Sequence, residues 1–391
     1  MIGVETALQL VEKNILEQKY ISVKLDASLN CVLSKDIISP INMPPFQQSA
    51  MDGYALNLCN TSVYTIIDEV KAGDGHNPIL KNGEAIRIFT GAPVPETANA
   101  VVMQEKTITK NGSLELQNIV VKNDNIRPKG EQVKKGGIAL KKGTKITPAA
   151  IGFLASLGIT DVDVYKQPKI SLIVTGNELT IPGQPLEYGK IFESNSMMLA
   201  AALKNIGCSN INIQYVNDDY SATKKLLDNS INSNDIVIIT GGISVGDYDF
   251  VGKALNELKV NEIFYKVKQK PGKPLYFGKK ENTAIFALPG NPAAALSCFY
   301  IYVYPALQKI SGHAKIHLKG TIAKSLSTFD KKGNRAQFLK AIFSDNSVSI
   351  LEGQSSAMLQ TFALANALVY LPEEHNKIEV NDDVQVILLP N

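Results

Sequence analysis

Tryptophan is absent from this 391-residue sequence, and histidine occurs only four times. A site built on histidine, whether a catalytic triad or a metal centre, therefore has few candidate residues. Cysteine is equally scarce, and no two cysteines have the CxxC spacing. This argues against a disulfide framework and a zinc knuckle, and for reduced thiols in a cytoplasmic protein. The four are Cys31, Cys59, Cys208 and Cys298.

Long apolar runs and an excess of one charge are also missing. No segment reaches the roughly 18 to 20 apolar residues that a membrane span needs. The first residues carry no basic stretch followed by an apolar run, so we expect no signal peptide. Forty basic residues against thirty-seven acidic ones give a net charge of +3, which does not predict a nucleic-acid partner. We expect a cytoplasmic protein with neither a membrane nor a nucleic acid as partner.

The chain is too long for one hydrophobic core, and its length suggests roughly two to four domains. Apolar residues have helical spacing over 4–18, and a second helix is predicted over 147–158, where Thr147 and Pro148 supply the cap and first turn. Short alternating runs between glycine-bearing turns predict a β-rich domain over about 54–140. Short strands return from residue 313 and predict a small β domain.

Strands and helices alternate between residues 169 and 312. Continuous apolar strands of this kind indicate a parallel sheet covered on both faces by helices. Ligands of such sheets bind at the carboxyl ends of the strands. The candidate binding loops are therefore 175–178, 217–219, 240–249 and 289–292. The apolar run 293–307 is predicted to be a buried helix.

The strand before Gly241 and Gly242 runs directly into these two glycines. Glycines remove side chains where a strand turns into a helix, and the exposed amides with the helix N-terminus would suit a phosphate. The segment is neither a Walker A loop nor a GxGxxG fingerprint. Spacing alone leaves two alternatives open, namely phosphate binding and an ordinary tight turn.

Four lysines fall within eight residues at 266–273, and no acid lies near them. Like charges this close repel unless an anion is present or the side chains splay into water. Pro271 and Pro274 stiffen the backbone, so Lys270 and Lys273 would be held in place. An anion site and a solvated surface loop both remain open.

Pairs of acids follow two strands of the predicted sheet. Asp218 and Asp219 follow one strand, and Asp247 and Asp249 the next. Carboxylates at adjacent strand ends can share a Mg²⁺ with a substrate phosphate, whereas single aspartates commonly cap helices. Two further loops contain Asp52 and Thr90, and their chemistry alone assigns them no role.

Seven segments, taken together, resemble one family, the molybdopterin molybdenumtransferases, to which the E domain of gephyrin is related. The resemblance covers nearly the whole chain. The segments are SAMDGYA (49–55), IFTGAPVP (88–95), RPKGE (127–131), VTGNEL (174–179), TGGISVGDYDF (240–250), KPGKP (270–274) and LPGNP (288–292).

The resemblance implies an architecture of four parts. These are an elongated helical domain from residues 1–44 and 141–168, an inserted β-rich domain over 45–140, an α/β molybdopterin-binding domain over 169–312 and a C-terminal β-barrel domain over 313–391. Members are homodimers with the active site at the subunit interface. They convert adenylylated molybdopterin and molybdate, with Mg²⁺, into molybdenum cofactor and AMP. Transient contacts with the molybdopterin adenylyltransferase and with acceptor molybdoenzymes are also expected.

The resemblance also implies roles for individual residues. Asp218 and Asp249 match acids needed for Mg²⁺-dependent release of AMP. Lys270, Lys273 and Ser356 match residues that hold molybdate. The positions expected to matter for activity also include Asp52, Thr90, Glu178 and Lys266. The residues expected to hold or shape the pterin and phosphate site are Gly241, Gly242, Ser244, Pro289 and Pro292.

Three positions depart from the family pattern. Lys340 stands where members often carry arginine, so it keeps the charge for molybdate but loses the bidentate fork. Gln132 stands where some members have aspartate. Ala294 stands where some members have serine after the Pro-Gly-Asn-Pro turn, which would remove one hydroxyl donor to the oxyanion.

Two rival functions remain. The adenylyltransferase that makes the activated pterin has a similar α/β domain but is much shorter. A scaffold protein that keeps the fold without catalysis is the other alternative, and retention of Asp218, Asp249, Lys270 and Lys273 argues against it. A generic NAD or ATP protein is excluded because the required loop is missing.

Overall fold

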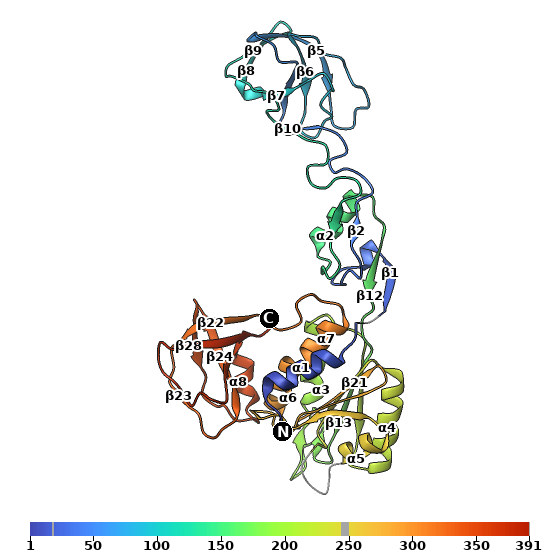
Figure 1. Cartoon of the computed structure of the whole chain (residues 1–391), viewed down its shortest axis with the longest axis vertical. Coiled ribbons are helices and arrows are strands. Elements are labelled where there is room, and N and C mark those ends of the chain that lie inside the picture. The colour runs from blue at the N-terminus through green and yellow to red at the C-terminus, as the bar shows by residue number, and fades with distance from the viewer. Residues whose placement is uncertain (18, 244–249, 391) are drawn as a thin grey trace.

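The computed structural model describes residues 1–17, 19–243 and 250–390 as an elongated chain of four units (Figure 1). A β module lies at one end and a small central unit follows it. An α/β unit and a C-terminal barrel lie side by side at the other end. In this described part, no helix is long and apolar enough to cross a membrane.

The β module is a six-stranded sheet with strand order β7-β4-β6-β5-β9-β8. Gly53 in β4 is required by packing, because a Cβ there would lie 1.8 Å from the carbonyl oxygen of Val102. The strands are β4 (Gly53–Leu56), β5 (Val63–Val70), β6 (Glu84–Ile88), β7 (Ala100–Met103), β8 (Thr107–Lys110) and β9 (Ser113–Leu116), with the pair β3 (Gln48–Ser49) and β10 (Ile126–Arg127) below them.

The central unit combines one helix with two short antiparallel pairs. Helix α2 (Pro148–Ser156) begins as the sequence predicts, since the Thr147 hydroxyl oxygen accepts a bond of 3.2 Å from the Ala150 amide. The pairs are β1 (Tyr20–Lys24) with β12 (Asp161–Tyr165), and β2 (Ile37–Ile38) with β11 (Ile138–Leu140).

Helix α1 (Val4–Asn14) lies apart from this unit. Its buried residues Val4, Ala7 and Val11 belong to the core of the α/β unit, and Figure 1 shows it beside α6 and α7. The helix is also shorter than predicted, because Ile15 already has an extended backbone.

The α/β unit is a six-stranded sheet with strand order β16-β13-β17-β21-β20-β18. The first four strands are parallel, as predicted. The last two, β20 and the edge strand β18, join through antiparallel pairings that the sequence did not predict. The bounds are β13 (Ile170–Thr175), β16 (Ile211–Val216), β17 (Ile236–Thr240), β18 (Asn261–Tyr265), β20 (Tyr276–Lys280) and β21 (Thr283–Leu288).

Helices cover both faces of this sheet, because successive strand residues point alternately into two cores. Leu172 and Ile238 face one core, while Ile173 and Ile239 face the other. The first core is covered by α1, α3 (Asn195–Asn205), α6 (Pro292–Cys298) and α7 (Tyr304–Ile310), and the second by α4 (Tyr220–Ser233) and α5 (Phe250–Glu257). A π-helical segment, Phe299–Val303, joins α6 to α7. The segment 293–307, predicted as one buried helix, is therefore continuously helical.

The C-terminal unit is a closed five-stranded barrel, because β24 pairs with both β25 and β26. Its strands are β22 (Gly320–Ser325), β24 (Ala336–Ser344), β25 (Ser347–Ile350), β26 (Ala367–Leu371) and β28 (Asp383–Leu388), accompanied by β23 (Phe329–Asp330), β27 (Lys377–Ile378) and α8 (Leu359–Leu364). Strand β19 (Gln269–Lys270) comes from the lysine-rich segment and adds to β24, so it connects the two units.

Candidate active site

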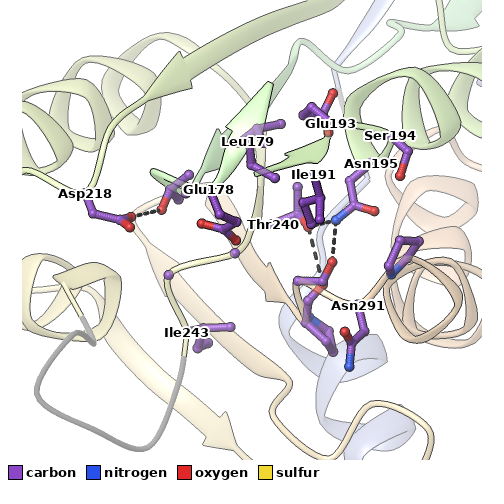
Figure 2. Close-up of a pocket in the computed structure, with 18 of the residues that line it drawn as sticks. Glu178, Leu179, Ile191, Glu193, Ser194, Asn195, Asp218, Thr240, Ile243 and Asn291 are labelled. Atoms are coloured by element: carbon purple, nitrogen blue, oxygen red, sulfur yellow. Dashed lines mark hydrogen bonds between the residues drawn. The ribbon is translucent and has the colours of Figure 1, made fainter. Parts of the chain in front are cut away.

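A pocket of about 470 Å³ lies at the carboxyl ends of the parallel strands (Figure 2). All four loops that the sequence singled out contribute to it. One wall was not predicted and consists of the short parallel pair β14 (Leu179–Thr180) and β15 (Ile191–Phe192). Among the predicted site residues, the lining includes Glu178, Asp218, Gly241, Gly242, Pro289 and Pro292.

The two glycines after β17 are required by a close approach of neighbouring strands. Gly241 has a φ of +88°, and a Cβ there would lie 2.2 Å from the carbonyl oxygen of Thr175. At Gly242, with a φ of +61°, a Cβ would lie 2.8 Å from Val251. The tight turn is thus established, and the same turn presents a wall without side chains to the pocket.

The two acids after β16 have different roles. The Asp218 carboxylate accepts bonds from the Thr175 hydroxyl at 3.0 Å and from the Asn177 amide at 3.2 Å, so it is fixed at the pocket wall. The Asp219 carboxylate caps α4 by accepting a bond of 2.6 Å from the Ala222 amide. Asp219 is therefore a helix cap, whereas the Mg²⁺ role expected for Asp218 stays a prediction.

Three predicted residues, Ser244, Asp247 and Asp249, lie outside the described residues. Over residues 1–17, 19–243 and 250–390, no group of three or more histidine, cysteine, aspartate or glutamate side chains is arranged to hold a metal ion.

Asn195 is a pocket residue that the sequence analysis missed. Its Nδ2 donates to the Thr240 hydroxyl at 2.8 Å and to the Gly290 carbonyl oxygen at 2.7 Å (Figure 2). The side chain is buried, and its Oδ1 has no hydrogen-bond partner. No signal in the sequence pointed to it, because a polar residue at the start of a helix is ordinary.

The lysine-rich loop lies at the rim of the same pocket. Lys270 and Lys273 are exposed, and the next residue, Pro274, lines the pocket. Lys266 stands at the start of this segment and has a φ of +68°. Its ammonium is 4.7 Å from the centroid of the Tyr265 ring. The loop that carries the exposed lysines therefore borders the pocket through Pro274.

The barrel contributes Ser356 to this rim. Its hydroxyl accepts a bond of 3.0 Å from Asn291 Nδ2, and its carbonyl accepts one of 3.3 Å from the Ala294 amide. Residues of the sheet loop and the barrel thus meet here, and the molybdate contact expected for Ser356 stays a prediction.

Lys340 is buried, and its ammonium donates to three carbonyl oxygens, those of Gly353 at 2.8 Å, Ser355 at 3.1 Å and Met358 at 3.1 Å. Burial lowers the pKa of this ammonium. An ammonium has three donors, so all of them are used to hold the segment that carries Ser356. The expected contact between Lys340 and molybdate stays a prediction, and it would require the release of one of these carbonyls.

Asp52 and Thr90 contact each other, but in the distant β module. The Asp52 carboxylate accepts bonds of 2.7 Å from both the amide and the hydroxyl of Thr90. These bonds hold the pKa of the Asp52 carboxyl below its ordinary value. Gln132 is exposed on the connection between the β module and the central unit. Its main-chain N–H donates to the Met43 carbonyl oxygen at 2.9 Å. Within one chain, the β module with Asp52 and Thr90 and the connection with Gln132 both lie away from the α/β unit that holds the pocket (Figure 1).

Three family models match successive parts of the chain. Residues 2–158 match the MoeA N-terminal region (domain I and II), residues 171–309 match a probable molybdopterin binding domain, and residues 323–389 match the MoeA C-terminal region (domain IV).

Two curated relatives cover almost the full chain. The molybdopterin molybdenumtransferase of Haemophilus influenzae is 35% identical over 93% of this chain and 92% of its own. The molybdopterin molybdenumtransferase of Staphylococcus aureus is 32% identical over 99% of this chain and 95% of its own. Among solved structures, the molybdopterin biosynthesis moeA protein from Pyrococcus horikoshii OT3 superimposes with a TM-score of 0.87 at 29% identity, covering 100% of both chains.

Proposed function

The chain belongs to the molybdopterin molybdenumtransferase family, the transferases of molybdenum cofactor biosynthesis, and from this premise we propose how its pocket works. The substrates are adenylylated molybdopterin and molybdate, and the products are molybdenum cofactor and AMP. The observation that carries this proposal is the pocket itself, which combines a side-chain-free glycine turn, a fixed carboxylate and a lysine-rich rim.

The glycine turn is the proposed seat of the substrate's phosphates. A phosphate can approach a backbone closely only where no Cβ intervenes, and Gly241 and Gly242 meet this condition. The pocket volume of about 470 Å³ lies within the roughly 300–1,000 Å³ typical of small-molecule sites. Pro289 and Pro292 shape the opposite wall.

Mg²⁺ fits the oxygen donors on this wall. It usually binds through one or two protein carboxylates together with substrate phosphates and water. Asp218 is such a carboxylate, Glu178 lines the same pocket, and Asp249 belongs to the expected set. A bound Mg²⁺ would supply charge to the pyrophosphate and favour loss of AMP. The protein's own contribution is the fixed orientation of Asp218 by Thr175 and Asn177.

Molybdate is proposed to bind at the rim. It is a dianion, and its transfer out of water requires compensating positive charge. Lys270 and Lys273 supply that charge, and Ser356 supplies a hydroxyl. In this proposal, Lys340 acts mainly by holding the Ser356 segment through its three carbonyl contacts.

The proposed step breaks the phosphoanhydride bond. An oxygen of molybdate, or a water beside it, attacks the phosphorus of the pterin pyrophosphate, and AMP leaves with the bonding electron pair. If molybdate is the attacking group, water then cleaves the P–O–Mo bond and frees the phosphate. The two dithiolene thiols bind molybdenum, and their two protons leave with one oxide ligand as water. Lys266 is proposed to influence this charge from the lysine-rich segment.

A second copy of the chain is proposed to complete the site. Large apolar side chains are exposed around the pocket wall, and such patches mark interaction surfaces. Asp52 and Thr90 lie in a module too remote to reach the pocket of their own chain. A homodimer in which each β module approaches the partner's pocket would bring Asp52 and Thr90 to the pocket residues of the other chain. The exposed residues are Tyr188, Ile191, Phe192, Met197 and Tyr215.

The cellular setting follows from the chemistry of the substrate. The adenylylated pterin comes from an adenylyltransferase, and the product passes to molybdoenzymes, so transient contacts with both are proposed. A cytoplasmic location agrees with the four cysteines, which are free thiols.

The test is AMP release from adenylylated molybdopterin by the purified chain with Mg²⁺, with and without molybdate. Molybdate-dependent AMP release, with molybdenum retained on the pterin, supports the proposal. Tight binding of a substrate that stays intact would instead support the scaffold alternative, and it would direct attention to Gln132, Ala294 and Lys340.

A further inference from the structure

A buried polar network lies beneath the loop that carries Lys270 and Lys273. Gln269 is fully buried, and its Nε2 donates to the carbonyl oxygens of Pro271 at 3.1 Å and Gly272 at 3.3 Å. Its Oε1 accepts a bond from the hydroxyl of Tyr302, which is also fully buried. One glutamine amide therefore contacts both residues that separate the two lysines.

The loop between Lys270 and Lys273 packs closely against this buried network. Gly272 has a φ of +83°, and a Cβ there would lie 2.3 Å from Cys298 Sγ. The main-chain carbonyl of Gln269 accepts a bond of 3.2 Å from Arg335 Nη1, and β19 pairs with β24. The loop is thus held by the α/β unit on one side and by the barrel on the other.

Burial of the Gln269 side-chain amide at this position is costly in free energy. The surroundings are apolar, with Phe264 against Tyr302 at a centroid distance of 6.5 Å. Burying an amide costs free energy unless its donors and acceptor are paired. Here both ends are paired. The Nε2 also lies 3.5 Å from Cys298 Sγ in α6, but the two oxygen atoms that accept from it are both loop carbonyls. Burial also raises the pKa of Tyr302 well above its ordinary value, so the phenol remains a donor and keeps the amide in one orientation.

We infer that Gln269, oriented by Tyr302, positions Lys270 and Lys273 to receive the oxyanion. The inference rests on the function proposed above and deepens it. Because the carbonyls of Pro271 and Gly272 are bound on the buried side, the flanking lysine side chains are left exposed at the rim. Gln269 touches no substrate in this scheme, so it is a positioning residue.

The test compares Gln269→Leu and Tyr302→Phe with a matched control. The control is Tyr304→Phe, which removes a half-buried phenol from the same helical run without touching Gln269. Two quantities are measured for each variant, namely the molybdate concentration that half-saturates AMP release and the Kd for adenylylated molybdopterin. Unfolding midpoints are recorded in parallel.

Loss of two loop bonds in Gln269→Leu should raise the half-saturating molybdate concentration about tenfold. Tyr302→Phe should raise it by about threefold, because the amide loses its orienting partner but keeps its donors. The Kd for the pterin should stay within about twofold, and Tyr304→Phe should change neither quantity. A purely structural role would lower the unfolding midpoint without this selective effect on molybdate, and that pattern would overturn the inference.

The double variant Gln269→Leu/Tyr302→Phe separates stability from positioning. Removing both partners leaves no orphaned phenol or amide between them, so part of the lost stability should return. The molybdate effect should nevertheless persist, since the loop carbonyls still lack their donor. Recovery of molybdate dependence together with stability would contradict the inference.

Lysine variants distinguish failure of this inference from failure of the proposed function. Lys270→Ala and Lys273→Ala should each weaken molybdate dependence in the same assay. If they do so while Gln269→Leu does not, only the positioning role is wrong. If neither lysine matters, the proposed molybdate site itself is wrong.

Discussion

The side-chain nitrogen Nδ2 of Asn195 donates to the carbonyl oxygen of Gly290 at 2.7 Å, and this bond joins two walls of the pocket. Asn195 opens α3, while Gly290 belongs to the loop before α6. The same nitrogen reaches the Thr240 hydroxyl at 2.8 Å, directly before the glycine turn. One buried side chain thus fixes the relative positions of the glycine turn and the proline-rich loop.

Replacing Asn195 with alanine should weaken this connection. Loss of both bonds leaves buried partners unsatisfied, so we expect the free energy of unfolding to fall by roughly 1–3 kcal/mol. Binding of adenylylated molybdopterin should weaken as well. Urea unfolding and a binding titration measure the two effects. The control is Asn205→Ala at the exposed end of the same helix, which should change the free energy of unfolding little; an equal loss there would contradict a special role for Asn195.

The two neighbouring aspartates provide a test of the proposed Mg²⁺ site. Asp218→Asn keeps an acceptor for Thr175 but removes the charge, so Mg²⁺-dependent AMP release should fall at least about tenfold. Asp219→Asn keeps the cap of α4, since asparagine caps helices as well as aspartate does. Its activity should therefore match the unmodified chain. Mg²⁺ titrations of both variants decide the matter, and similar losses in the two would point to general disruption instead.

Gly241→Ala should be far more damaging than an alanine at another glycine with a positive φ. Gly183 has a φ of +94° and open space around it, so alanine there meets only the backbone strain of about 1–2 kcal/mol. Alanine at Gly241 adds a contact of 2.2 Å with the Thr175 carbonyl oxygen. Unfolding free energies should separate the two variants clearly. Equal values would mean that the turn relaxes without cost.

Mixed subunits test whether the site is shared between two chains. Asp52→Asn and Asp218→Asn should each be inactive in the AMP assay. If Asp52 acts in the partner's pocket, random mixing of the two variants should restore about a quarter of the normal activity, because half of the dimers contain one intact site of two. An absence of recovery after verified subunit exchange would place both residues in one chain's site.

The titration of Asp52 tests its contact with Thr90. The amide and hydroxyl of Thr90 lower the pKa of this carboxyl, the amide contributing most. Thr90→Val removes the hydroxyl alone, so the pKa should rise but remain below its ordinary value. Carboxyl chemical shifts followed over pH measure it, with Thr109→Val in the same module as a control. A pKa that does not move would show that the hydroxyl does not matter.

The sign of the linked stability effect follows from that lowered pKa. The native bonds favour the ionised carboxyl, so their contribution is fully present above the ordinary pKa of aspartate. It is lost as the pH falls through the lowered pKa of the folded state. Thr90→Val should therefore reduce the stability at neutral pH more than at strongly acidic pH.

Much of the α/β unit was predictable because its strands are continuous apolar segments. The apolar segments at residues 170–175, 211–216 and 235–240 correspond to β13, β16 and β17. The antiparallel strands β18 and β20 escaped prediction because polar residues interrupt their apolar character, Asn261 and Glu262 in β18 and Lys279 and Lys280 in β20. Helix α1 was predicted, but its packing partner was not, since an apolar helical face specifies burial and not the surface that buries it.

The sequence by itself determined the family, the order of the parts and the loops that line the pocket, because each depends on local motifs and apolar periodicity. Only the tertiary structure decided that Asp218 faces the pocket while Asp219 caps a helix, that Lys340 holds three carbonyls, and that Gln269 and Tyr302 meet beneath the lysine loop. These relationships join residues distant in the chain or separate neighbours by the direction of their side chains. Packing fixes both, and no local pattern encodes them.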